Sequence, residues 1–170
     1  MFSLSHQKAK LTSVNPRAEL HGQDKKLAVD LKFEIKVSND VLSEFDPSLK
    51  SALYKKADTQ GDLIDEPGNL PALKFPLMGA IKWGKGFAGY KTMIHYGVSG
   101  AQDIVLLECQ VDNFRFDCQD GGTVAVAFRV IAHPEPTELG RLCEMIQQEV
   151  EMSLIEPEAE TVQELFGEAA

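Results

Sequence analysis

The chain has 170 residues, of which 44% are hydrophobic and 25% charged, proportions that are ordinary for one soluble globular domain. It contains no apolar run near the ~20 residues of a membrane-spanning helix, and its first residues lack the pattern of a signal peptide, so we expect a cytoplasmic protein. The net charge of −9 is uneven, because residues 1–100 have a balance of +3 (14 basic, 11 acidic) and residues 101–170 a balance of −12 (3 basic, 15 acidic). This charge distribution argues against a protein that coats duplex DNA, because such a protein makes many phosphate contacts. It is compatible with a local basic groove or with a basic protein partner.

The clearest strand prediction covers residues 26–37, where apolar and polar side chains alternate over eleven residues. Alternation with period two is typical of a strand in an antiparallel sheet that has one buried face and one face open to water. The side chains expected on the buried face are Leu27, Val29, Leu31, Phe33, Ile35 and Val37.

Two short helical segments are expected after this strand. Asp40 is predicted to cap a helical turn, and Asp46–Pro47 has the pattern of an N-cap followed by proline at the first position of a second helix. Residues 56–72 contain two glycines, two prolines and four acidic residues, so we expect a long surface loop there.

Residues 104–132 predict a long hairpin closed by the loop Asp120-Gly121-Gly122. The apolar side chains of the first arm occupy odd-numbered positions up to Val111 and even-numbered positions from Phe114. This change of parity requires one extra residue near Asp112–Asn113, a β-bulge. With that bulge both apolar rows face inward, including Leu107 in the first row, and the expected pairs are Cys109–Ala132, Val111–Val130, Phe114–Phe128, Phe116–Val126 and Cys118–Val124.

The remaining elements suggest a mostly β protein. Residues 90–96 alternate as a strand, residues 137–148 predict a short helix with Thr137 as its cap, and Val150, Met152 and Leu154 alternate as a last strand. We expect an antiparallel β-sandwich or open barrel with two short helices, formed by residues 1–155, and an acidic tail at 156–170. The apolar side of the helix is expected to contain Leu139, Leu142, Cys143 and Ile146.

The segment KWGKGFAGYK, residues 82–91, allows three interpretations. Gly84, Gly86 and Gly89 form a G-x-G-x-x-G pattern, but a strand pattern follows it rather than a helix, so a glycine-rich turn is the better account than a phosphate cradle. The same segment interleaves aromatic and basic residues, as surfaces that bind single-stranded nucleic acid do, although large aromatic side chains usually pack in a core. The residues of this interpretation are Lys74, Lys82, Trp83, Lys85, Phe87, Tyr90 and Lys91.

The acidic second half suggests a surface for a basic protein partner, because clustered charge steers association. Dispersed acidic residues that keep the protein soluble are the alternative. Leu165 and Phe166 add a possible docking motif in the tail, for which a solvated tail is the alternative. The candidate acidic residues are Asp103, Glu108, Asp112, Asp117, Glu144, Glu149 and Glu151.

No residue pattern indicates catalysis, a metal site or a cofactor. The four histidines have no metal-ligand spacing, and no nucleophile motif is present. Three cysteines, Cys109, Cys118 and Cys143, leave one unpaired in any internal disulfide scheme, so we expect small buried thiols in a reducing compartment.

Several segments together resemble a family of small uncharacterised proteins from tailed phages and prophages of proteobacteria. These segments are NPRAELHG at 15–22, residues 30–54, VDNFRF at 111–116 and GGTVAVAFRV at 121–130, and the similarity covers residues 1 to about 155. The resemblance implies a phage accessory protein in the host cytoplasm and transfers no catalytic residue. In this setting the sequence favours binding of a host or phage protein through the acidic surface, for example to inhibit a defence or DNA-metabolism factor. Binding of single-stranded nucleic acid as a recombination accessory is the alternative, and an enzyme of unknown class is the third interpretation.

Overall fold

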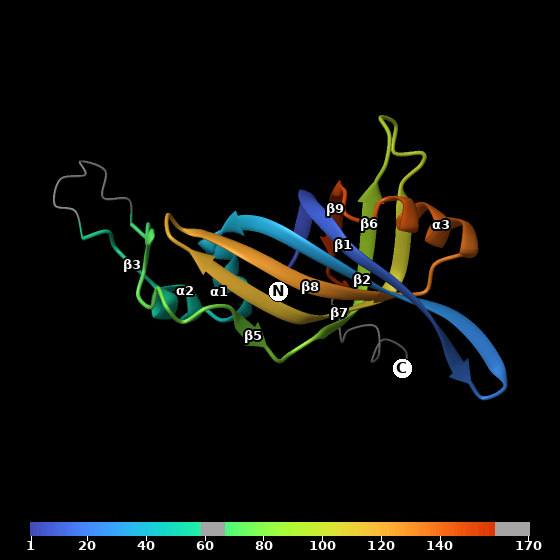
Figure 1. The fold of residues 1–170 in the computed structure, drawn as a ribbon, viewed down its shortest axis with the longest axis horizontal. Helices are drawn as coiled ribbons and strands as arrows, with labels where there is room; N and C mark the ends of the chain where they lie inside the picture. Colours follow the sequence, from blue (N-terminus) through green and yellow to red (C-terminus); the bar gives the residue numbers. More distant parts are fainter. Residues whose placement is uncertain (59–66, 159–170) are drawn as a thin grey trace, which may run out of the picture.

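An antiparallel barrel of six strands forms the body of the protein (Figure 1). In this computed structural model, which describes residues 1–58 and 67–158, the strand order around the barrel is β7-β6-β9-β1-β2-β8. A further pairing between β7 and β8 closes the barrel, so the prediction of a mostly β, antiparallel fold with few short helices is confirmed. The barrel strands are β1 (Leu4–His21), β2 (Asp24–Ser38), β6 (Phe87–His95), β7 (Ile104–Gln119), β8 (Thr123–Ala132) and β9 (Glu149–Ile155).

The shorter elements lie outside the barrel. Strand β5 pairs with β7 outside the barrel, and β3 pairs with β4 as a separate small ribbon. None of the described helices is both long and apolar enough to cross a membrane. The bounds are η1 (Asn39–Val41), α1 (Leu42–Phe45), α2 (Leu49–Leu53), β3 (Tyr54–Lys55), β4 (Ala72–Leu73), β5 (Ile81–Trp83) and α3 (Pro136–Glu144).

The predicted β7–β8 hairpin is confirmed, with its register and its bulge. Phe116 pairs with Val126, and the ladder shifts between Asp112 and Arg115, where Asn113 has a φ of +58°. Asparagine tolerates this left-handed conformation better than most residues, which suits it to the bulge. Phe114 lies inside the shifted segment, and its ring still stacks on that of Phe128 with the centroids 6.0 Å apart.

A second irregularity in β7, which the sequence analysis did not predict, reverses the parity again. Glu108 has a φ of +52°, and the β6–β7 register shifts beside it. Leu106 is therefore buried, whereas Leu107 is 62% exposed. The prediction that Leu107 faces inward is wrong, because it assumed an unbroken strand from Leu107 to Val111.

Strand β1 was also missing from the predicted elements. It pairs with β9 through Leu4–Lys10 and with β2 through Lys10–His21, and it therefore joins the two halves of the barrel. Its sequence is mostly polar and contains Pro16, so it lacks the alternating apolar pattern that indicated β2. Its position in the barrel follows from its neighbours rather than from its own composition.

The predicted helix caps need correction. Ser38, not Asp40, caps the first turn, because its hydroxyl accepts the N–H of Asp40. The second helix begins at Leu49, later than predicted, and Asp46 accepts the N–H of Ser48 at 2.8 Å.

Helix α3 is capped two residues earlier than expected. Glu135, not Thr137, is its N-cap and forms a capping box with Glu138, with Pro136 at the first helical position. Leu142 is the one residue of the helix that is fully buried against the barrel. Cys143 and Ile146, which were expected on the same apolar side, are exposed. Of the other two thiols, Cys109 is buried and Cys118 partly buried.

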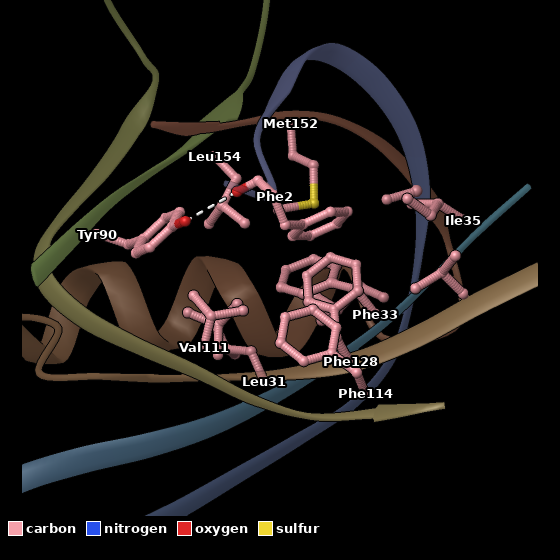
Figure 2. Packing of buried hydrophobic residues seen from close by; sticks show 14 of the residues in the cluster. Phe2, Leu31, Phe33, Ile35, Tyr90, Val111, Phe114, Phe128, Met152 and Leu154 are labelled. Carbon is pink, nitrogen blue, oxygen red and sulfur yellow. Dashed lines mark hydrogen bonds between the residues drawn. The ribbon is translucent and has the colours of Figure 1, made fainter. Parts of the chain in front are cut away.

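The barrel interior is filled by a cluster of aromatic and aliphatic side chains (Figure 2). Phe2 lies at its centre and is fully buried, with ring centroids 5.3 Å from Phe45, 5.3 Å from Phe114 and 5.5 Å from Phe128. Burial of such rings is the largest favourable contribution to the stability of a domain of this size. The alternation predicted over residues 26–37 is confirmed by Leu31, Phe33 and Ile35, labelled in Figure 2, but it is wrong at Ala28, which was expected on the wet face and is fully buried.

Candidate nucleic-acid interface

The glycine-rich segment between β5 and β6 interrupts what would otherwise be one strand along β7. Both strands lie on the same edge of β7, since β8 occupies the opposite edge. Trp83 pairs with Phe114, and Phe87 pairs with Val111, so the interruption lies opposite the bulge at Asp112–Asn113. The glycines therefore have a structural role as a strand break, as the sequence favoured over a phosphate cradle.

Gly86 is required at this break by a close approach of two backbones. A Cβ atom at Gly86 would lie 2.9 Å from Cβ of Asp112 and 3.2 Å from the carbonyl oxygen of Val111. A Cβ at Gly84 would meet no atom within 4 Å. The break thus brings residue 86 against β7 and leaves an opening beside it.

This opening is a cavity of about 620 Å³, which we call the notch. Its walls combine two aromatic side chains, two cations and two side-chain amides, the mixture of apolar and polar groups that ligand sites commonly have. The lining residues are Lys82, Trp83, Gly84, Gly86, Phe87, Ala88, Gln110, Asp112, Asn113 and Arg129.

Two smaller depressions of about 280 and 190 Å³ extend the notch across the outer face of β8. The first shares Lys82, Asn113 and Arg129 with the notch, so the two depressions adjoin each other. Ala125 and Ala127 line them with small side chains, which leaves room between the longer residues of β2 and β7. We call this extension the trough; its charged lining residues are Lys32, Glu34, Lys82, Arg115, Asp117 and Arg129.

Positive charge in the trough is only partly neutralised. Lys82 lies directly opposite Arg115 in the β5–β7 ladder, an arrangement in which like charges repel. Both side chains are exposed, as is Lys32, and no ion pair joins any of the three to another described residue. An anionic ligand would relieve this repulsion.

Arg129, by contrast, is held in a fixed position. Its Nε and Nη2 donate to the two carboxylate oxygens of Asp112 at 2.8 Å each, and its Nη1 lies 3.5 Å from Asp30. The hydrogen bond to Asp112 raises the pKa of Arg129, so the guanidinium stays charged. Arg129 lines both the notch and the trough, so its guanidinium lies where the two depressions meet.

The two aromatic residues of the notch are half-buried. Trp83 packs edge-on against Phe45 with centroids 5.8 Å apart, and Phe87 contacts Phe45 and Phe114 while the Nζ of Lys85 lies 5.9 Å above its ring. The indole Nε1 of Trp83 is buried and has no hydrogen-bond partner among the described residues. Both rings belong to the core on one side and to the notch on the other.

Part of the predicted aromatic and basic set does not belong to this site. Tyr90 is fully buried in the barrel and hydrogen-bonds to Phe2, so its expected role as an exposed stacking platform is wrong (Figure 2). Lys74 donates to the carbonyl of Ser51 beside α2, and Lys91 is half-buried opposite Ile155 of β9. Neither lysine lines the notch or the trough.

The predicted acidic residues lie in several places rather than in one cluster. Two of them form ion pairs, Asp112 with Arg129 and Glu149 with Lys8, and two contact histidines, Asp103 with His95 and Glu151 with His6. Glu108, Asp117 and Glu144 are exposed on β7 and at the end of α3. Leu165 and Phe166 lie outside the described residues.

The residues that complete the site were not predicted from the sequence; they are Lys32, Gln110, Asn113, Arg115 and Arg129. A signal for them was present, because each lies in the bulge or at a polar position of a strand whose apolar rows were predicted to face inward. Residues 1–58 and 67–158 contain no group of three His, Cys, Asp or Glu side chains arranged to hold a metal ion. Comparison of the chain with protein-family models, curated proteins and solved structures gives no match.

Proposed function

We propose that the protein binds single-stranded nucleic acid in the notch and the trough. The observation that carries this proposal is a cavity of about 620 Å³ walled by Trp83 and Phe87 and adjoining a trough whose cations Lys32, Lys82 and Arg115 form no ion pair with any described residue. Proteins that bind single strands combine aromatic rings for base stacking with cations along the backbone path. The side-chain amides of Gln110 and Asn113 can hydrogen-bond to base edges.

The balance of charges favours a single strand over a duplex. The net charge of −9 opposes the broad backbone contact that duplex binding needs. Lys32, Lys82 and Arg115 offer three phosphate contacts, which correspond to a log–log salt slope of about 2 at ~0.7 per phosphate. Stacking of a base in the notch contributes ~1–3 kcal/mol.

The test uses the intrinsic fluorescence of Trp83, the one tryptophan of the chain. Titration with a short oligonucleotide at ~50 mM salt should change this fluorescence, because the indole lines the notch. Fluorescence anisotropy of a labelled oligonucleotide gives the affinity independently. The absence of binding at micromolar protein would contradict the proposal.

A matched pair of variants locates the interaction. Lys82→Glu with Arg115→Glu reverses two charges in the trough, whereas Lys25→Glu with Lys26→Glu reverses two exposed charges near the turn of the β1–β2 hairpin. We expect the trough variant to lose about tenfold or more in affinity and the hairpin variant to lose far less. Equal losses would show non-specific attraction rather than a site.

Binding of a host or phage protein is a second candidate, favoured by the exposed carboxylates of Glu108, Asp117 and Glu144. If a basic partner uses these groups, reversing them to lysine should reduce what a pull-down from a proteobacterial lysate recovers, more strongly at low salt. A second charge-reversal block in residues 156–170 tests the tail. Recovery that neither block nor salt changes would contradict an acidic interface.

A further inference from the structure

Ser153, His95 and Asp103 form a continuous hydrogen-bonded array on the outer face of the barrel. Nε2 of His95 lies 2.8 Å from Oγ of Ser153, and Nδ1 of the same ring lies 2.9 Å from Oδ2 of Asp103. The second oxygen, Oδ1 of Asp103, accepts the backbone N–H of Tyr96 at 3.0 Å. The three residues come from β9, from β6 and from the turn before β7, so the array depends on the pairing of β6 with β9 and on the β6–β7 hairpin.

The chemistry of the groups determines the direction of the hydrogen bonds. An ionised carboxylate can only accept, so Nδ1 of His95 carries a proton and donates it to Asp103. In the neutral ring Nε2 is then an acceptor, and the hydroxyl of Ser153 donates to it. The backbone N–H of Tyr96, followed by His95, lowers the pKa of Asp103, which keeps this carboxylate ionised.

His6 covers this array. Its ring stacks on that of His95 with centroids 4.2 Å apart and planes inclined by 11°, and its backbone N–H donates to Oγ of Ser153 at 3.0 Å. As a result Ser153 is 6% exposed, although the side chain of His6 itself is 64% exposed. His6 lies in a bulge of β1 with a φ of +47°, a conformation that costs a non-glycine residue about 1–2 kcal/mol.

We propose that Ser153 is a nucleophile activated by His95, with Asp103 as the residue that orients His95, and that the site hydrolyses small carboxylic esters when His6 moves aside. A serine, a base within hydrogen-bond reach and a third group that holds the base are the parts that covalent acyl transfer requires. None of these residues lines the notch or the trough, so the proposal does not rest on nucleic-acid binding.

The reaction proceeds in two balanced steps. Oγ of Ser153 attacks the ester carbonyl carbon while its proton passes to Nε2 of His95, and the departing alcohol takes that proton as the bond between the carbonyl carbon and the alkoxy oxygen breaks. Water then attacks the acyl-serine, and His95 accepts a proton from it and returns it to Oγ. The products are the carboxylic acid and the alcohol, and no other reactant is consumed.

A fluorophosphonate probe tests the nucleophile directly, because Oγ displaces fluoride and forms a stable bond to phosphorus. We expect a mass adduct on the peptide that contains Ser153, and slow hydrolysis of p-nitrophenyl acetate by the same protein. Ser153→Ala should abolish both, and His95→Gln should slow both about 100-fold. Ser48→Ala is the matched control, since Ser48 hydrogen-bonds to Asp46 without a histidine and its loss should change neither rate.

Three further variants separate a role in the reaction from a role in folding. His6→Gly removes the covering ring at a position whose φ suits glycine, so it should increase labelling of Ser153 without loss of stability. Asp103→Asn should slow labelling and change its pH profile, and Asp103→Glu should restore part of the rate. Circular dichroism and thermal melts establish that each variant is folded.

The outcomes are distinct. Labelling of Ser153 that requires His95 supports the proposal. The proposal is overturned if neither the natural protein nor His6→Gly acquires an adduct, if the adduct lies on another residue, or if folded His95→Gln reacts as fast as the natural protein.

Discussion

The hydroxyl of Tyr90 donates a hydrogen bond to the backbone carbonyl of Phe2 at 2.9 Å, inside the barrel (Figure 2). Both residues are fully buried, so this bond joins β6 to the N-terminal segment that precedes β1. Burial raises the pKa of Tyr90 to about 12, so the hydroxyl remains a donor across the physiological range. An aromatic residue that sequence patterning placed on a binding surface thus contributes to the stability of the fold.

Tyr90→Phe should lower the free energy of unfolding by about 1–3 kcal/mol, because it leaves the buried carbonyl of Phe2 without its donor. Urea denaturation at neutral pH measures the change. Tyr96→Phe is the control, since Tyr96 is 47% exposed, and we expect it to change stability by less than about 0.5 kcal/mol. A similar small change for Tyr90→Phe would mean that the hydrogen bond contributes nothing.

Two substitutions on β7 compare its two faces. Phe116→Ala should cost about 3–5 kcal/mol, because Phe116 is 1% exposed and its ring lies 4.8 Å from that of Phe45. Leu107→Ala, at a position 62% exposed, should cost less than about 1 kcal/mol. Chemical denaturation of both variants measures the two losses in the free energy of unfolding. A larger loss for Leu107→Ala than for Phe116→Ala would contradict the change of parity at Glu108.

Gly86 and Gly84 differ in the space around them and offer a test of the strand break. Gly86→Ala should cost about 1–3 kcal/mol and weaken oligonucleotide binding, because its Cβ would lie 2.9 Å from Cβ of Asp112. Gly84→Ala should have little effect on stability, since nothing lies within 4 Å of the new methyl group. Thermal melts and anisotropy titrations of both variants provide the measurement, and equal behaviour would contradict the close approach.

Acid should lower the stability of the folded protein, because it protonates the carboxylate of Glu19. Hydrogen bonds from His133 and then Arg17 lower the pKa of Glu19 from 4.5 to about 2. His21 also lies near, with its Nε2 3.6 Å from Glu19. Because the folded state binds this proton less tightly than the unfolded state, the contribution of Glu19 is present above pH ~4.5 and is lost as the pH falls towards ~2.

Glu19→Gln removes this titration, so its melting temperature should fall less steeply across the same window. Glu144→Gln, which replaces an exposed carboxylate at the end of α3, is the control and should follow the natural protein. Parallel curves for all three proteins would show that Glu19 makes no such contribution.

Where apolar and polar residues alternate strictly, the sequence alone determined local structure correctly. Leu31, Phe33 and Ile35 of β2 face the core as predicted, and the three-residue loop and parity change of the β7–β8 hairpin placed Phe116 opposite Val126. Loop length and alternation are local properties, so a short stretch of chain suffices to specify them.

Tertiary structure decided the rest, because alternation indicates which side of a strand is buried but not which strand lies beside it. Strand β1 is mostly polar, and its place in the barrel depends on pairing with β2 and β9. The notch depends on a bulge in β7 meeting a glycine break some thirty residues earlier in the chain. The array of Asp103, His95 and Ser153 is assembled from residues that share no sequence motif, because the pairing of β6 with β9 and the β6–β7 hairpin bring these side chains within hydrogen-bond reach.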